Sequence, residues 1–563
     1  MNSTNVEIVL NLHSPHYTDM HAAGLAGLWM TLKQFNREGI SYDKLKWELG
    51  EYEVVLNIQG SHLEAIEWLI QQSFLLNDGL IGFRAIDSGN LLAESRVARH
   101  QGLLNTFLQQ GILSKSDGIK SQSFEIDEGE LPLIVSYKSL TEYSHQKFAK
   151  NLCDRAGFLL EKPLAVAGWL NPGATVKHTA FTGKTSIEQN ALDALVLLYA
   201  PVVCCYFKIR SFAKGEKASA ALIIPEILNL KQFAETRMSY AKRHQAYKNF
   251  HASGIGDAAL RFLVTYESAV EIAKTYKVSR CRAVIFGKTP WNQKQKSPTD
   301  KYSVTADAKI CAAYQKAQNA FKDKYVVYGD SGSAIVPSLA KGLIADALIK
   351  HLPWYGELAA KITSKELFDR VCYESKGFRD MVEYAEWKEA SHGRFVEACH
   401  DALRGIYAGS FKQGNAEAKR QNASEEHGKN LGEKRISDER EKVRSKMIRC
   451  KNFSAFCSFI TEFWSKAGFS RVQQEYQAEL WNLVLDDWEM ARNLVLLSLV
   501  SYKGRKSPES PPELPSSNRV QAEDSDVDLD EDDGDEEEED DDDDDDDGDG
   551  ESVPLPSSLR NLR

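Results

Sequence analysis

One stretch of the sequence, residues 168–211, limits the possible folds more than any other. It ends in a predicted strand, Val202–Ile209, that reads VVCCYFKI and is apolar at nearly every position, which is typical of a strand covered on both faces. Ahead of it, a helix predicted at Ile187–Leu198 carries one apolar stripe that would face a sheet. A further strand, Val176–Thr182, is expected after the Pro172-Gly173 turn. The stretch predicts a packed core and contains no catalytic constellation.

Residues 1–110 predict a ferredoxin-like unit followed by a helix. Alternating apolar residues indicate a first strand at Val6–Leu12, and helical spacing follows over Asp19–Phe35. Two more strands precede a second helix, which opens with the capping box Ser61–Glu64. A last strand is predicted at Leu80–Ala85. The order β-α-β-β-α-β is that of a ferredoxin-like unit.

The remaining chain divides where its composition changes. Residues 111–303 predict a mixed α/β region with a basic loop, and residues 304–503 predict an almost entirely helical region. Within the latter, residues 381–503 predict a helical bundle, interrupted by a charge-dense segment, 411–435, expected to be a mobile insertion. Residues 504–563 are rich in Ser and Pro and then acidic, which predicts a disordered tail. The predicted fold class is therefore α+β.

The net charge of −12 conceals a basic body. Residues 523–551 hold 23 acids and no base, whereas residues 1–522 hold 67 bases and 58 acids, a net charge of +9. A mildly basic body is compatible with a polyanionic partner. The acidic run either keeps the tail solvated or imitates a polyanion, shielding the body or docking a basic partner.

Several classes of protein are not expected from this sequence. No apolar run reaches the roughly 20 residues that span a bilayer, and the N-terminus lacks the pattern of a signal peptide, so we expect a cytoplasmic protein with no membrane contact. The nine cysteines are scattered without a CxxC pair. We therefore expect buried, reduced cysteines, no metal site and no cofactor.

Short motifs that resemble catalytic signatures do not fit their structural contexts. Gly329–Gly332 matches the nucleophile signature of chymotrypsin-like proteases, but no double β-barrel is predicted around it. Gly183–Thr185 and Gly287–Thr289 resemble the end of a phosphate-binding loop, and both lack its first glycine. We expect no catalytic residue; a hydrolase that uses Ser331 is the alternative from the enzyme class.

Basic residues gather in three places that suit nucleic acid. In the loop 287–301, lysines would meet phosphates, Asn and Gln can read base edges, and Trp can act as a wedge. The candidates for DNA contact there are Lys288, Trp291, Asn292, Gln293, Lys294 and Lys296. The candidates for contact with an RNA or DNA backbone in the other two places are Lys208, Arg210, Lys214, Lys217, Arg237, Lys242 and Arg243. Tyr240, His244, Tyr247 and Phe250 interleave with the last of these, although aromatic residues at helical spacing are more often core.

Three segments carry a resemblance to a known family: LNLHSPHYTDMHAAGLAGLWMTL, GWLNPGATVKHTAF and LYAPVVCCYF. Together they resemble the large subunit of the type I CRISPR surveillance complex, Cascade. They are most similar to its myxobacterial-type branch, which also occurs in type I-B CRISPR-associated transposons of cyanobacteria. The resemblance covers roughly residues 5–380, and the rest is similar only in being a helical bundle.

The resemblance implies a non-catalytic subunit beside the 5′ handle of a guide RNA. Such a subunit recognises the protospacer-adjacent motif (PAM) on duplex DNA, opens the duplex and helps to hold the displaced strand, for antiviral interference or RNA-guided transposition. It implies as partners the guide RNA, the target DNA, backbone, handle-binding and small subunits, and either transposition proteins or a helicase-nuclease.

The resemblance also implies that the C-terminal helical domain is made separately in some relatives, for which Met381 would be the start here. The resembling segments transfer no PAM-reading residue to this sequence. A scaffold or regulatory relative that works without guide RNA remains the other alternative.

Overall fold

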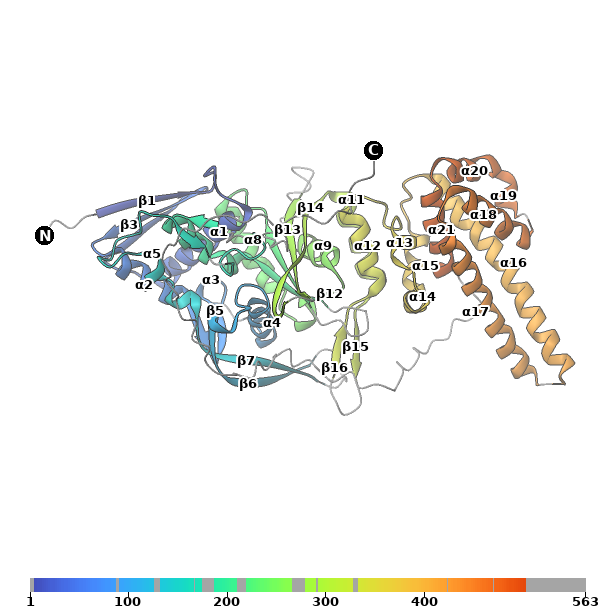
Figure 1. Ribbon diagram of the computed structural model, residues 1–563, viewed down its shortest axis with the longest axis horizontal. Helices are drawn as coiled ribbons and strands as arrows, with labels where there is room; N and C mark the ends of the chain where they lie inside the picture. The colour runs from blue at the N-terminus through green and yellow to red at the C-terminus, as the bar shows by residue number, and fades with distance from the viewer. Residues whose placement is uncertain are drawn as a thin grey trace, which may run out of the picture. The chain divides into compact units, whose positions relative to one another are not determined.

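The computed structural model describes residues 5–87, 91–125, 132–166, 168–174, 187–209, 219–265, 279–289, 292–327, 333–422, 424–468 and 470–502. Over these residues the protein is α+β, with several small sheets followed by a helical C-terminal region (Figure 1). This confirms the predicted fold class. The tail, residues 504–563, lies outside the described residues.

The N-terminal unit begins as the sequence predicts. Its elements are β1 (Asn5–Asn11), α1 (Asp19–Glu38), β2 (Leu45–Leu49), β3 (Glu53–Gln59) and α2 (His62–Ser73). The three strands form one antiparallel sheet in the order β1-β3-β2.

The last predicted strand of this unit pairs elsewhere. Residues 80–83 form β5 (Leu80–Phe83), which makes a hairpin with β4 (Phe74–Asn77) instead of lying beside β1. Asp78 and Gly79 both have positive φ, 57° and 81°, as a tight two-residue hairpin turn requires. The local turn therefore keeps this strand from completing the ferredoxin-like sheet.

A short helical segment and a long two-stranded ribbon follow. They comprise α3 (Arg84–Asp87), α4 (Ala93–Leu104), β6 (Ser114–Phe124), β7 (Leu133–Tyr143), α5 (Ala149–Leu152), and the pair β8 (Leu164–Val166) and β9 (Ile187–Gln189). The inner face of β7 and the end of β6 enclose a second, smaller core that is separate from the main one.

A five-stranded sheet occupies the middle of the chain, in the order β12-β10-β11-β13-β14. Its strands are β10 (Cys205–Ile209), β11 (Ser219–Pro225), β12 (His251–Ala252), β13 (Ser279–Thr289) and β14 (Asn292–Ala306), with helices α6 (Ala191–Leu198), α7 (Ala200–Val203), α8 (Leu230–Arg243), α9 (Ile255–Thr265) and α11 (Ala308–Ala320) around it. The predicted strand at 202–209 starts later than expected, because Pro201 opens the short helix α7. The predicted strand at 176–182 lies outside the described residues.

Helix α1 joins the N-terminal unit to this middle region. It packs on α6 and α7 at very short range, since a Cβ at Gly24 would lie 2.0 Å from the carbonyl oxygen of Val196. At Gly27 a Cβ would lie 2.2 Å from the carbonyl oxygen of Tyr199. Only glycine allows this approach.

The described residues after 304 are mainly helical but include a two-stranded pair, β15 (Lys324–Val327) and β16 (Ser333–Val336). Helices α12 (Leu339–Ile349), α13 (Leu358–Lys361), α14 (Lys365–Cys372) and α15 (Ser375–Glu383) lead to a bundle made of α16 (Ala390–Arg420), α17 (Glu425–Arg449), α18 (Phe453–Ala467), α19 (Arg471–Glu475), α20 (Gln477–Asp486) and α21 (Trp488–Ser501). Ile335 of β16 reaches back into the second core, next to residues of β7.

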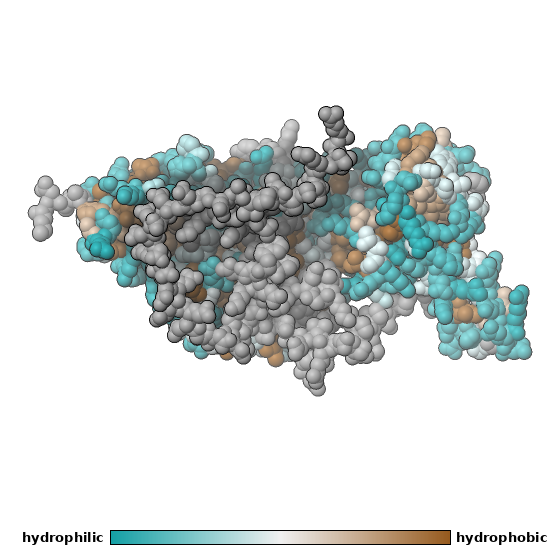
Figure 2. All heavy atoms as spheres, viewed as in Figure 1, coloured by the Kyte–Doolittle hydropathy of each residue, from teal (hydrophilic) through white to brown (hydrophobic). Residues whose placement is uncertain are grey.

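The segment predicted as a mobile insertion, 411–435, is helical over residues 411–420 and 425–435, which belong to α16 and α17 of a helical hairpin. A Cβ at Gly414 would lie 2.7 Å from backbone atoms of Gly432, so the two helices touch backbone to backbone there. Gly414 and Gly432 therefore permit close packing of the two helices. The surface of this hairpin is mostly hydrophilic (Figure 2).

Helix α21 is buried on nearly all sides. It packs against α16 and α20 and also against α13 and α15. Asn493 of α21 accepts a hydrogen bond from the amide of Ala359 (2.8 Å) and donates one to the carbonyl of Gly356 (2.8 Å). On α15, Phe378 and Met381 are buried. Among the described helices, none has the length and apolarity needed to cross a bilayer.

Candidate nucleic-acid interface

The five-stranded sheet brings two of the three predicted basic segments to one end. The residue pairs nearest that end lie almost side by side across the sheet. They are Ile209–Ser219, Ala220–Phe286 and Phe286–Pro298. The C-terminal end of β10, the N-terminal end of β11 and the tip of the β13–β14 hairpin therefore lie at the same end of the sheet. Arg210, Lys214 and Lys217 follow β10 in the sequence and lie outside the described residues.

The predicted basic loop 287–301 is largely a β-hairpin. Lys288 of β13 pairs with Lys296 of β14, and Thr289 pairs with Asn292. Gln293 and Lys294 follow on β14, while Trp291 lies outside the described residues. Two register shifts, at Ile285/Phe286 and at Lys288/Thr289, disturb the ribbon near its tip. Lysines, prolines and glutamines hide the strand pattern here, so the sequence reads as a loop.

Lys208 belongs to the same end of the sheet. It is partly exposed on β10, opposite Ala220 on one side and His251 on the other. The short strand β12 directly follows residues 247–250, where Lys248 is also partly exposed. The predicted candidate Lys208 therefore lies at the same end of the sheet as the β13–β14 hairpin.

Arg237 does not belong to this surface, which corrects the sequence-based expectation. Its side chain is buried, with 3% of the residue exposed. The guanidinium donates hydrogen bonds to the carbonyls of Val203 (2.9 Å), Cys204 (3.4 Å) and Val202 (3.5 Å), at the end of α7. Because α7 ends here, these carbonyls have no backbone N–H of a following helical turn to accept from. Arg237 therefore caps the C-terminal end of α7 and is not accessible to a nucleic acid.

The aromatic residues near Arg237 are core residues. Tyr240, His244, Tyr247 and Phe250 are all buried. Burial, assisted by Arg261 and Arg237, lowers the pKa of His244 to about 3, so it is neutral. The third predicted patch is thereby reduced to Lys242 and Arg243, which are exposed at the C-terminal end of α8.

Sequence reasoning missed two arginines on the same sheet. Arg282 of β13 forms an ion pair with Asp19 at the start of α1 (2.6 Å), and Arg280 forms one with Glu226 (3.6 Å). Lys301 of β14 is exposed, and partial burial of its ammonium together with Arg282 lowers its pKa. The polar and apolar alternation of residues 279–283 was the available signal for the arginines.

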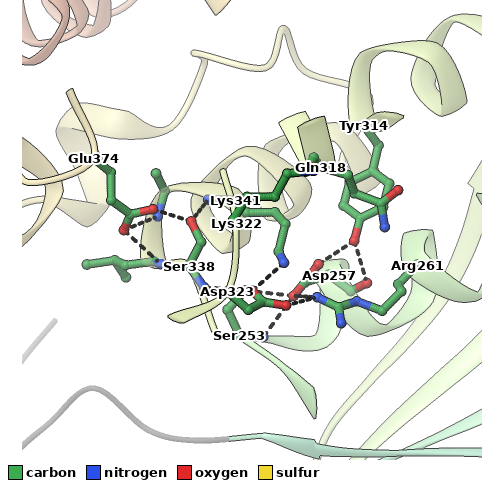
Figure 3. A network of polar contacts seen from close by, with 12 residues as sticks. Ser253, Asp257, Arg261, Tyr314, Gln318, Lys322, Asp323, Ser338, Lys341 and Glu374 are labelled. Atoms are coloured by element: carbon green, nitrogen blue, oxygen red, sulfur yellow. Dashed lines mark hydrogen bonds and ion pairs between the residues drawn. The ribbon is translucent and has the colours of Figure 1, made fainter. Parts of the chain in front are cut away.

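A buried polar network lies behind the sheet, between α9, α11 and α12 (Figure 3). We call Asp257, Arg261, Tyr314, Asp323 and Lys341 the ion network. Arg261 donates to Asp323 (2.9 Å) and Asp257 (3.4 Å), Lys341 pairs with Asp323, and Tyr314 donates to Asp257.

The ion network has a structural role, because most of its charged groups are buried. Asp257 is 0% exposed and Lys341 only 3%, so no substrate can reach them. Nearby, Ser338 donates to Glu374, which also accepts from the amides of Leu339 and Ala340 at the start of α12. Ser331, the candidate nucleophile, lies outside the described residues. In the part of the chain that the structure describes, no cluster of His, Cys, Asp and Glu could hold a metal ion.

Comparison with known proteins indicates the class of protein to which this chain is similar. Residues 9–198 match the DevT N-terminal domain, and residues 383–545 match the DevT C-terminal domain. The chain is also similar to the CRISPR-associated protein Cas8a1/Csx13 of Myxococcus xanthus (strain DK1622), with 25% identity over 541 residues that cover 88% of each protein. These similarities support a CRISPR-associated large subunit, the general class that the resembling segments indicate.

Proposed function

We propose that this chain is the non-catalytic large subunit of a type I-B CRISPR RNA-guided complex. In this role it lies beside the guide RNA handle, recognises the PAM on duplex DNA and stabilises the opened duplex. The observation that carries the proposal is that Lys208, near the end of β10, and the β13–β14 hairpin lie at the same end of the five-stranded sheet. Two-stranded ribbons of this kind enter DNA grooves in other proteins.

The residues of the β13–β14 tip would divide the work. Lys288, Lys294 and Lys296 would neutralise phosphates, Asn292 and Gln293 would read base edges, and Trp291 would enter between base pairs. Lys208, Arg210, Lys214 and Lys217, with Lys242 and Arg243 of α8, would hold the RNA or DNA backbone.

The first test is the double variant Lys294→Ala and Lys296→Ala in the assembled complex. Loss of two phosphate contacts should weaken binding to all duplexes alike and reduce the salt slope of log K by about 1.8. Lys162→Ala with Lys412→Ala, two exposed lysines outside the five-stranded sheet, is the matched control and should bind normally. Equal behaviour of both double variants would remove the hairpin tip from the DNA site.

A second test separates recognition of the PAM bases from binding of the DNA backbone. Asn292→Ala and Gln293→Ala should change the preferred PAM in a randomised-duplex selection and leave non-specific binding unchanged, because amide side chains carry base discrimination of about 1–3 kcal/mol per good pair. An unchanged preference in both variants would assign PAM reading to other residues.

The remaining parts of the proposal concern the assembly. Co-purification with the proteins encoded beside this chain, followed by sequencing of bound RNA, tests for the guide RNA and for the backbone, handle-binding and small subunits. Neighbouring transposase genes without a helicase-nuclease gene would indicate RNA-guided transposition, and the reverse would indicate interference. A fluorophosphonate probe that labels Ser331 would contradict the non-catalytic role.

A further inference from the structure

Among the strands that the structure describes, β1 pairs only with β3, and the direction of its other edge can be assigned. The amide of Leu12 donates to Tyr52 (2.7 Å), so every second residue before it, including Ile8 and Leu10, turns its backbone groups toward β3. On the far side of β3, the amide of Gln59 donates to Lys44 (2.9 Å), which confirms the alternation. Glu7 and Val9 therefore direct their N–H and C=O groups away from β3, where no described strand pairs with them.

This edge lacks the features that protect other edges. β6, which pairs only with β7 in the described chain, has two register shifts, a Gly118 with φ of 124°, and the exposed charges Lys115, Asp117 and Lys120. β1 is regular over all seven pairs from Asn5–Gln59 to Asn11–Glu53, has no proline, and carries one charge. A regular, unprotected edge is a template for another strand.

The sheet face beside this edge is acidic with a small apolar centre. Ile8 and Leu10 point into the core, so Glu7, Val9 and Asn11 lie on the outer face. Val9 is 54% exposed and pairs with the half-buried Val55, which in turn pairs with Glu48. The outer face carries Glu7, Glu48 and Glu53 against a single lysine, Lys46.

These charges restrict what can dock on the edge. Phosphates of a nucleic acid would be repelled by the glutamates, and so would the acidic run at residues 523–551 of the same chain. A second copy would bring its own Glu7 and Glu53 against the same face. An extended segment of another protein with Lys or Arg on this face meets neither obstacle.

We propose that β1 is a docking edge for an extended segment of another protein subunit, which adds a strand to the β1-β3-β2 sheet. The added strand places a small apolar residue beside Val9 and Lys or Arg near Glu7 and Glu53. Main-chain hydrogen bonds supply the affinity and the alternating side chains supply the specificity. The identity of the partner as a subunit of the same assembly rests on the proposed function.

Residue-resolved amide hydrogen exchange tests the edge directly, on the isolated chain and on the complex with the proteins encoded beside it. In the isolated chain the amides of Glu7 and Val9 should exchange at least tenfold faster than those of Ile8 and Leu10. In the complex they should slow by at least tenfold. Protection already present in the isolated chain, or absent in the complex, would overturn the proposal.

Substitutions at Val9 separate the contribution of its backbone N–H to assembly from that of its side chain. Val9→Pro removes an outward N–H and leaves the hydrogen bonds to β3 in place, so it should weaken assembly at least tenfold. Val9→Thr keeps the N–H and should assemble normally. Should Val9→Pro fail to fold, Glu7→Lys with Glu53→Lys replaces it and should weaken assembly by a similar factor at low salt.

The outcomes distinguish this proposal from the proposed function. A complex that shows protection of β1 but binds no guide RNA would contradict the function alone. A complex that binds RNA and DNA while β1 stays unprotected would contradict the docking edge alone. Concentration-dependent dimers of the isolated chain that Val9→Pro abolishes would replace the partner subunit by a second copy.

Discussion

The ion network and the α16–α17 hairpin use the same charged residue types in opposite surroundings. In the ion network, Asp257 and Lys341 are almost completely buried. In the hairpin, Arg435 pairs with Glu417 while each side chain is 40% exposed. Water screens the second pair and not the first. Charge content alone therefore says little about what holds a region together.

The largest effect is expected for Asp257→Ala. It leaves the cation of Arg261 buried with one carboxylate fewer, which should lower the free energy of unfolding by about 3–5 kcal/mol. Urea unfolding followed by circular dichroism measures the change. A loss below about 1 kcal/mol would place the ion network in the same class as the hairpin pair.

Acid should weaken the ion network next. Burial alone would raise the pKa of Asp323, but Arg261 and Lys341 outweigh it and lower the pKa to about 2. The folded-state pKa is below the unfolded one, so this stability is complete above about pH 4 and is lost as pH falls toward 2, on the order of 2 kcal/mol. Urea midpoints at pH 5, 4 and 3 measure the loss, and Asp323→Asn should flatten the trend.

Gly414→Val should loosen the hairpin alone. Its side chain would collide with the backbone at Gly432, at an expected cost of about 1–3 kcal/mol. Limited proteolysis should then cut within residues 411–438 while the ion network keeps its urea midpoint. Gly409→Ala is the control, because a Cβ there meets nothing within 4 Å and should stabilise the helix by up to about 1 kcal/mol. Equal proteolysis of the two variants would contradict close packing.

The smallest effect is expected for Arg435→Ala, which removes the exposed pair with Glu417. The expected loss is about 0.2–1 kcal/mol and should vanish in 1 M salt. Thermal melting at two salt concentrations measures it. A larger loss that survives salt would show that the two regions differ less than their burial suggests.

Local patterns predicted the elements better than their pairing. The order from β1 to α2 followed from alternation and from one capping box, because both signals are contained in neighbouring residues. The partner of Leu80–Phe83 did not, since the choice between β1 and β4 depends on the turn at Asp78 and Gly79 and on competing contacts. Likewise, the lysine-rich segment after Gly287 hid a hairpin whose register only the sheet reveals.

For the candidate interface, the sequence supplied the charges but not their exposure. Arg237 repeats the spacing of Leu230, Phe233 and Ala234 on α8, so its buried position was readable from the helical stripe. That the end of β10 and the β13–β14 hairpin lie at one end of the sheet was not readable, because it depends on strand order. Arg280 and Arg282 were overlooked because they sit inside a strand rather than in a loop.

Helix α21 could not keep its present surroundings in a protein that began at Met381. Such a product would lack α13, α14 and most of α15, and the side-chain amide of Asn493 would lose both main-chain partners near residue 358. A strip of leucine and valine would then face water. To stay soluble, the shorter protein would therefore need a binding partner from the time of its synthesis. That partner would have to cover the apolar surface left by the missing helices.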